Sequence, residues 1–230
     1  MSADSVLIGA RKIRVWPRRQ PIIALDEPLI RLIDCDDLVP FHDELRRALL
    51  KLRDDPAHSE WIFKGGCGLK VRDIPRWGNR IATLLHRRAV ELFRQVFAAT
   101  EVVVDCSWAS LYGQGDYCMP HSHVRSVASV VYLLDPGDSD EADPLSGKFC
   151  FVDPRIAGCC KIEPDRLTHP LLPEMRPGSM LIFPAELVHC VNAYNGTAPR
   201  ITLTWNFHTR ALAGSSDSFG TSRLAGQKKA

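Results

Sequence analysis

The spacing of apolar residues predicts two amphipathic helices in the first hundred residues of the chain. Residues 38–55 (LVPFHDELRRALLKLRDD) have apolar side chains at positions 41, 45, 48, 49 and 52, which gathers them on one face of a helix. Residues 77–100 continue this spacing over a longer stretch. The glycine-rich segment between the two, WIFKGGCGLKVRDIP, shows no period and is expected to be irregular. Residues 6–33 alternate unevenly around three prolines, which predicts one or two short strands.

After Thr100 the pattern changes to short β-type runs separated by turn signals such as GQGD, MRPG and NGTAP. Strands that follow two helices favour an α+β chain whose second half is a β-sandwich or jelly roll, with the helices packed on one sheet. Residues 1–100 would then support the barrel, residues 101–210 would form it, and residues 211–230 would be a flexible polar tail. The β-type runs cover residues 101–112, 126–134, 147–152, 178–183 and 199–208.

Composition and charge narrow the class of protein. The chain has 230 residues, 45% hydrophobic and 24% charged, with a net charge of +2, and this small charge gives no attraction to nucleic acid. No apolar run approaches the ~20 residues that cross a bilayer, and the N-terminus lacks the pattern of a secretory signal. The eight cysteines form no CxxC pair and are expected to be reduced thiols. We expect a cytoplasmic protein without nucleic-acid or membrane partners, and a homodimer is compatible with this pattern.

Three histidines are candidate metal ligands. His121 and His123 lie in the segment YCMPHSHVRS, and residues two apart on a strand point to the same face. Such a pair alone is also typical of a solvated strand end. His189, which closes the strongly apolar run MLIFPAELVH, adds a third imidazole from a separate strand. The three together favour a metal site over ordinary polar surface residues.

Arg200 is the second candidate, because it opens the strand RITLTWNF. Strand alternation puts Arg200, Thr202 and Thr204 on one face and Ile201 with its apolar neighbours on the other. An arginine on an inward strand face is costly unless it meets an anion. The sequence therefore predicts a carboxylate-bearing partner, which a guanidinium can bind through two parallel hydrogen bonds.

The order of motifs resembles a known family. W-x-x-L-Y-G-x-G-x-Y-x-x-x-H-S-H is followed by S-V-V-Y-L, F-x-D-P-R, P-G-x-x-x-x-F-P-x-x-x-x-H-x-V and R-I-T-L-x-W-N-F. This order, over residues 104–208, is similar to the iron(II)/2-oxoglutarate-dependent oxygenases. More narrowly, it resembles a bacterial and phage-type subfamily in which an H-x-H pair replaces H-x-D.

The resemblance implies a double-stranded β-helix with the metal in its open mouth. It implies a dioxygenase that uses Fe(II), 2-oxoglutarate and O2, and that forms succinate while it hydroxylates a small metabolite, an amino acid or a carrier-bound substrate. His121 matches the first metal ligand of the family, His123 takes the position of the carboxylate ligand, and His189 matches the distal ligand.

The resemblance also assigns residues to the cosubstrate. Arg200 falls where the family holds the distal carboxylate of 2-oxoglutarate, with Thr202 beside it. Tyr112 and Tyr132 fall where relatives place tyrosines that bond the cosubstrate. The expected substrate contacts are Arg125, Arg155 and Asn206.

His123 is the departure from the family pattern and leaves three arrangements open. All three histidines bind the metal, or Asp116 replaces His123 as a ligand, or the site is degenerate or filled by zinc, since imidazole suits several metals. A second function is also open, namely a cupin-like three-histidine metal-binding protein or non-redox enzyme that does not use 2-oxoglutarate. Arg200 separates the two functions, because a simple metal binder has no need of it. Desaturation or ring formation would use the same residues, and the sequence does not identify the substrate.

Overall fold

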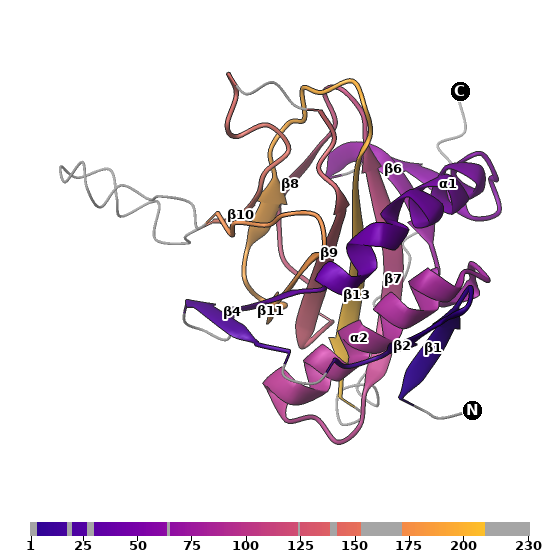
Figure 1. The fold of residues 1–230 in the computed structure, drawn as a ribbon. Coiled ribbons are helices and arrows are strands. Elements are labelled where there is room, and N and C mark those ends of the chain that lie inside the picture. The colour runs from indigo at the N-terminus through magenta and orange to yellow at the C-terminus, as the bar shows by residue number, and fades with distance from the viewer. Residues whose placement is uncertain are drawn as a thin grey trace, which may run out of the picture.

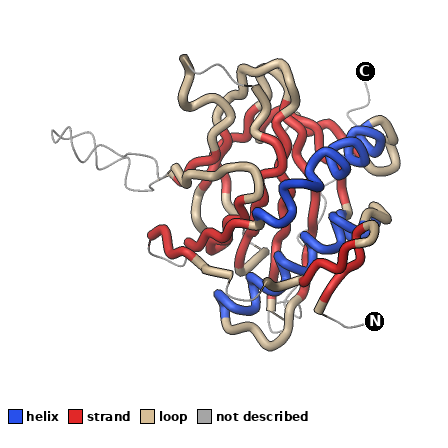
Figure 2. The backbone as a smooth tube through the Cα atoms, in the orientation of Figure 1, coloured by secondary structure: helices blue, strands red, loops and turns tan. Residues whose placement is uncertain are grey.

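A computed structural model describes residues 4–17, 20–26, 30–63, 65–123, 125–138, 142–152 and 172–209. Figures 1 and 2 show two helices against one face of a large curled sheet, with a short hairpin beside the second helix. The elements are β1 (Ser5–Ile8), β2 (Arg11–Arg14), β3 (Ile23–Asp26), β4 (Ile30–Asp34), α1 (His42–Arg53), β5 (Ser59–Ile62), β6 (Gly66–Arg72), α2 (Arg80–Phe97), β7 (Val103–Tyr112), β8 (Tyr117–His121), β9 (Ala128–Asp135), β10 (Phe149–Phe151), β11 (Ser179–Pro184), β12 (His189–Val191) and β13 (Arg200–His208). Two 3-10 turns, Asp36–Phe41 and Ile74–Arg76, precede the helices.

The large sheet has the strand order β10-β12-β8-β6-β7-β13-β9-β11-β4-β3, and β5 pairs with β6 outside this path. Every pairing in it is antiparallel. The sheet curls so that β8, β10 and β12 face the long central strands. This is the α+β architecture with a double-stranded β-helix, as predicted.

The two predicted helices form within the expected ranges. α2 begins after Asn79, whose side-chain oxygen accepts hydrogen bonds from the backbone N–H groups of Ile81 and Ala82, which have no partner inside the helix. The helix ends at Ala98, which adopts a left-handed conformation. α1 begins only at His42, because Pro40 lies in the preceding 3-10 turn.

The expectation of an irregular glycine-rich segment before residue 77 is wrong. Part of it forms β6, which pairs with β7 through Leu69 to Arg72 and with β8 through Gly66 and Cys67. The glycines interrupt the apolar alternation that marks a strand, so the local pattern is lost while the pairing with neighbours remains. The strands predicted after Thr100 correspond to β7, β9, β10, β11 and β13.

The central sheet separates two environments. The face toward the helices carries the main core, which includes Leu45, Leu85, Phe93 and Trp205. The opposite face packs a smaller cluster of apolar side chains between the two halves of the curled sheet: Ile30, Leu32, Val131, Phe149, Phe151, Leu181 and Phe183. The predicted site lies on this second face.

Both predicted parts of the chain, residues 1–100 and residues 101–210, contribute strands to the large sheet. Strands β3 to β6, from the N-terminal hundred residues, are hydrogen-bonded into the same sheet as the later strands. The predicted tail, residues 211–230, lies outside the described residues. No helix among the described residues is long and apolar enough to cross a membrane.

Candidate metal centre

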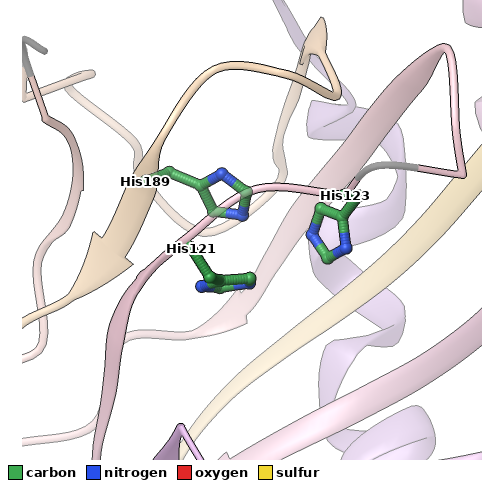
Figure 3. A group of neighbouring side chains, drawn as sticks. All are labelled: His121, His123 and His189. Carbon is green, nitrogen blue, oxygen red and sulfur yellow. The ribbon is translucent and has the colours of Figure 1, made fainter.

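The three predicted histidines meet at one point on the concave face of the sheet (Figure 3). His121 ends β8 and His189 begins β12, and the two are directly opposite each other in this antiparallel pair. His123 follows two residues after β8, where its backbone N–H donates to the Ala185 carbonyl at 2.8 Å. One ring nitrogen from each histidine lies within 4.8 Å of the other two. Strand pairing and one loop contact therefore bring the three imidazoles together.

Two of the rings are already held in the orientation that a metal ligand needs. Nδ1–H of His121 donates to the Met119 carbonyl at 2.8 Å, and Nδ1–H of His189 donates to the Leu187 carbonyl at 2.8 Å. A proton on Nδ1 leaves the lone pair of Nε2 free. Backbone acceptors of this kind typically fix the tautomer of metal-binding histidines. The Nε2 atoms of His121 and His189 are thus available to one ion.

Asn206 fixes the third ring. Its amide lies 3.2 Å from His123 Nδ1, and its Oδ1 accepts a hydrogen bond from Ser129 Oγ at 2.8 Å. Half a turn of the amide would present Oδ1 to Nδ1–H and free Nε2 for a metal, while the nitrogen would then donate to Ser129. The structure thus places Asn206, expected at the substrate, behind His123, because the side chain is buried between β13 and β9.

Burial keeps two of the imidazoles neutral. It is the main cause that lowers the pKa of His189 to about 3, with smaller contributions from His121 and His123. Burial also lowers the pKa of His123 to about 4, with smaller contributions from His121 and Lys70. A histidine must be deprotonated at the binding nitrogen to hold a metal. Near neutral pH these residues therefore fit a divalent ion, and the donor set suits ferrous iron.

Aromatic side chains pack against His189 in the cavity. The His189 ring lies 5.4 Å from the Phe149 ring and 4.8 Å from the Phe183 ring, centroid to centroid. Phe183 is fully buried. These rings restrict rotation of His189 and keep its surroundings apolar, which explains the strong effect of burial on its pKa.

Arg200 lies in the same cavity as the histidines. It opens β13 directly opposite Tyr112 of β7, and its guanidinium carbon is 5.7 Å from the Tyr112 ring centroid. The residue is 5% exposed, and its Nη1 has no hydrogen-bond partner within the described part of the chain. Burial lowers its pKa. A buried cation without a counter-ion is costly, so the fold holds this guanidinium ready for an anion.

A glycine makes the room for this arginine. Gly147 has φ of +61°, and a Cβ placed there would lie 2.8 Å from Cδ of Arg200. Thr202 and Thr204 follow on the same face of β13 and line the cavity, as strand alternation predicted. Ile201, Leu203 and Trp205 enter the helix-side core.

The two predicted tyrosines lie on opposite faces of the sheet. Tyr112 is buried and lines the cavity beside Arg200, and burial raises its pKa. Tyr132 lies on the opposite face, in the helix-side core, where its hydroxyl is 2.6 Å from Nε2 of His42. It pairs across the sheet with Leu203, and paired residues share a face. Placing Tyr132 at the cosubstrate is therefore wrong.

The remaining candidates do not gather at the centre. Arg125 is exposed and is not among the residues that line the cavity. Arg155 lies outside the described residues. The carboxylate of Asp116 accepts a hydrogen bond from the Gly113 backbone at 2.8 Å within its own turn and is not part of the histidine group. This geometry favours His123 over Asp116 as the third ligand.

Lys70 is a cavity residue that the sequence analysis missed. It lies on β6, and its ammonium is 4.2 Å from the ring centroid of Trp108, which also lines the cavity. The signal was present in GCGLK, where Gly66, Gly68 and Lys70 alternate as strand neighbours do. Two small residues hid the strand period.

The histidine-bearing segment matches a known family, and the fold matches many solved structures. The family model described as "Putative 2OG-Fe(II) oxygenase" matches residues 106–206. No curated protein matches the sequence.

Three of the similar structures show how far the likeness in fold extends. A prolyl hydroxylase from Trichoplax adhaerens, in complex with a hypoxia inducible factor peptide, is 13% identical, with a TM-score of 0.61 over 84% of this chain and 90% of that one. The viral collagen prolyl hydroxylase of Paramecium Bursaria Chlorella virus-1 is 13% identical, with a TM-score of 0.55 over 81% and 99%. HygX from Streptomyces hygroscopicus, with nickel and 2-oxoglutarate bound, is 13% identical, with a TM-score of 0.57 over 79% and 83%.

Proposed function

We propose that the chain, of which residues 106–206 match the 2OG-Fe(II) oxygenase family model, is an iron(II)- and 2-oxoglutarate-dependent dioxygenase that hydroxylates a small or carrier-bound organic substrate. His121, His123 and His189 would hold the iron. The observation that carries the proposal is Arg200, a buried guanidinium whose Nη1 has no hydrogen-bond partner among the described residues, in the same cavity as three convergent imidazoles.

The residues of this chain divide the work of such a site. Arg200 would bind the distal carboxylate of 2-oxoglutarate, with the Thr202 hydroxyl beside it and the Tyr112 ring along one side. When bound, iron and 2-oxoglutarate together would activate O2, with loss of CO2 and formation of succinate. The apolar wall of Val131, Phe149 and Phe183 would keep bulk water from the reacting atoms.

Hydroxylation is the outcome we propose among those that the same residues allow. Two of the three similar structures described above are prolyl hydroxylases, which share the fold of this chain. The cupin-like alternative, metal binding without 2-oxoglutarate, leaves the free nitrogen of Arg200 without a purpose.

Anaerobic titration of the iron-loaded protein with 2-oxoglutarate tests the proposal. Chelation of ferrous iron by the cosubstrate is expected to give a visible charge-transfer band, and admission of O2 should then release succinate. A protein that binds iron but shows neither the band nor succinate would be the cupin-like alternative.

Substitution of His123 tests the unusual ligand. His123→Asp restores the family carboxylate and should retain iron, whereas His123→Ala should weaken iron binding, which equilibrium dialysis measures. Iron affinity that is indifferent to His123→Ala would place the residue away from the metal. His58→Ala, at an unrelated turn, is the matched control.

A further inference from the structure

Lys70 joins the metal cavity to a second cavity next to it. The second cavity is walled by the glycine-rich part of β6 and by Ile62 and Tyr117, and we call it the glycine groove. Lys70, Ser110, Tyr112, Cys118 and His121 line both spaces. A molecule in the groove would therefore lie beside the metal ligand His121.

The strand register places Lys70 where the two cavities meet. Lys70 of β6 is opposite Ser110 of β7, and Ser110 is opposite Thr202 of β13. Paired residues share a face of a sheet. The side chains of Lys70, Ser110 and Thr202 therefore form a row across the sheet that leads from the glycine groove to the metal cavity. The Lys70 ammonium lies over the Trp108 ring, which supports its position.

Two glycines of the groove let the backbone of β6 lie close to Tyr117 and Tyr112. Gly66 has φ of +153°, and a Cβ there would lie 2.6 Å from the Tyr117 carbonyl oxygen. Gly68 has φ of +154°, and a Cβ there would lie 2.8 Å from the Tyr112 ring. These positions suit glycine because the backbone approaches its neighbours closely and adopts a conformation that other residues avoid.

The described residues that line the metal cavity and the glycine groove carry positive charge only. Among the described residues that line the two cavities, Lys70 and Arg200 carry charge, and none is Asp or Glu. Glu60 faces Lys70 across β5 and β6, but its carboxylate is bonded to Arg72. Half-buried Lys70 forms no ion pair or hydrogen bond through its ammonium in the described part of the chain, and burial lowers its pKa. If 2-oxoglutarate neutralises Arg200, Lys70 still has no ion-pair partner among the described residues.

We propose that Lys70 binds an anionic group of the substrate, a carboxylate or a phosphate, while the substrate's apolar part lies in the glycine groove. This inference rests on the proposed function for the identity of the reaction, but not for the anion site itself. Ile62 and Tyr117 supply apolar contacts for the body of such a molecule, and Ser110 supplies a hydroxyl next to the ammonium.

Calorimetry with matched acid and amide probes tests the site. Nickel-loaded protein, saturated with 2-oxoglutarate to occupy Arg200, would be titrated with 3-phenylpropionate, phenyl phosphate and the neutral 3-phenylpropanamide. Wild-type protein should bind at least one of the two anions about tenfold more tightly than the amide, as expected for a hydrogen bond to a charged group. The better-bound anion identifies the substrate group as carboxylate or phosphate.

Variants then assign the preference to Lys70. Lys70→Met should abolish it, Lys70→Arg should retain most of it, and Lys51→Met, an exposed lysine on α1, should leave it unchanged. A wild-type protein without a preference for either anion, or a preference that survives Lys70→Met, would overturn the inference.

The same titrations separate the two proposals. If 2-oxoglutarate does not bind the wild-type protein but the anion preference depends on Lys70 and persists in Arg200→Met, the proposed function fails and the anion site stands. If 2-oxoglutarate binds and the preference is absent, the anion site fails and the proposed function stands.

Discussion

Each face of the central sheet contains a buried arginine, and the two are held in opposite ways. On the helix side, Arg88 of α2 is fully buried and its donors are used. It donates to both oxygens of Asp37 at 2.6 and 2.5 Å, to the Val15 carbonyl at 2.9 Å and to the Arg14 carbonyl at 3.0 Å. On the cavity side, Arg200 is equally enclosed, yet its Nη1 has no partner within the described residues.

The difference separates a structural cation from one prepared for a ligand. A buried charge is tolerated when hydrogen bonds and an opposite charge compensate for lost water. Arg88 has both within the chain, and it fastens α2 to the N-terminal segment and to the turn that carries Asp37. Nη1 of Arg200 has no such partner among the described residues, and a bound anion would supply the missing compensation. Removal of Arg200 should therefore weaken anion binding without loss of stability. Removal of the Asp37 carboxylate beside Arg88 should lower stability without a change in binding.

Replacement of Arg200 by Met should have the largest effect on function. Loss of one partner of a buried charge pair weakens binding by about 2–5 kcal/mol, so 2-oxoglutarate affinity should fall by that amount in calorimetry. The free energy of unfolding should stay the same or rise, because the variant removes an uncompensated buried charge. An affinity that stays within about threefold of wild type would refute the assigned role.

Asp37→Ala should have the converse effect. It leaves Arg88 buried without a carboxylate, and the free energy of unfolding should fall by about 3 kcal/mol. This is the lower end for a buried pair, because the Asp37 side chain is 39% exposed. Urea denaturation measures the change. Asp36→Ala, which removes an exposed ion pair with Arg176 from the same turn, should change stability little. Affinity for 2-oxoglutarate should be unaltered in both variants.

Acid should destabilise the cavity face of the metal-free protein. His189 and His123 have pKa values of about 3 and 4 in the folded state, against 6.5 when unfolded. As pH falls from 6.5 toward 4, the unfolded chain binds protons that the folded chain does not. Each imidazole should then lower the free energy of unfolding by about 1.4 kcal/mol per pH unit. Denaturation midpoints across this range should show a shallower slope in His189→Gln. A slope equal to that of wild type would argue against a neutral, buried His189.

The smallest expected effect comes from the two tyrosines. Tyr112→Phe should weaken 2-oxoglutarate binding by about 1 kcal/mol, the value of one hydrogen bond, with little change in stability. Tyr132→Phe should lower stability by about 1 kcal/mol through loss of its contact with His42, and should not change binding. Calorimetry and thermal denaturation of both variants give a matched pair, and a loss of binding in Tyr132→Phe would contradict its place on the helix side.

The sequence predicted the part of the site that depends on strand alternation and motif order. His121, His123 and His189 converge, and Arg200 faces the cavity, because residues two apart on a strand share a face. Tyr132 was misplaced because its position was inferred from the resemblance to the family alone. Its register opposite Leu203, which decides the face, becomes visible only when the strands are paired.

Features that depend on contacts between distant segments were not predictable. β6 was missed because its glycines lack strand propensity, and its pairing with β5, β7 and β8 keeps it in the sheet. Lys70 was missed with it. Asn206 was expected to touch substrate because it points to the cavity face, whereas Ser129 and His123 from other elements engage its amide. Local sequence determined which face a residue occupies, and packing determined what it meets there.

β6 forms hydrogen bonds with strands from both halves of the barrel. Gly66 and Cys67 are paired with β8, the strand that ends in His121, while Leu69 to Arg72 are paired with β7. A molecule that presses against the backbone of β6 would therefore push on the strand that positions a metal ligand. The same strand that walls the glycine groove is thus hydrogen-bonded to the strand that ends in His121.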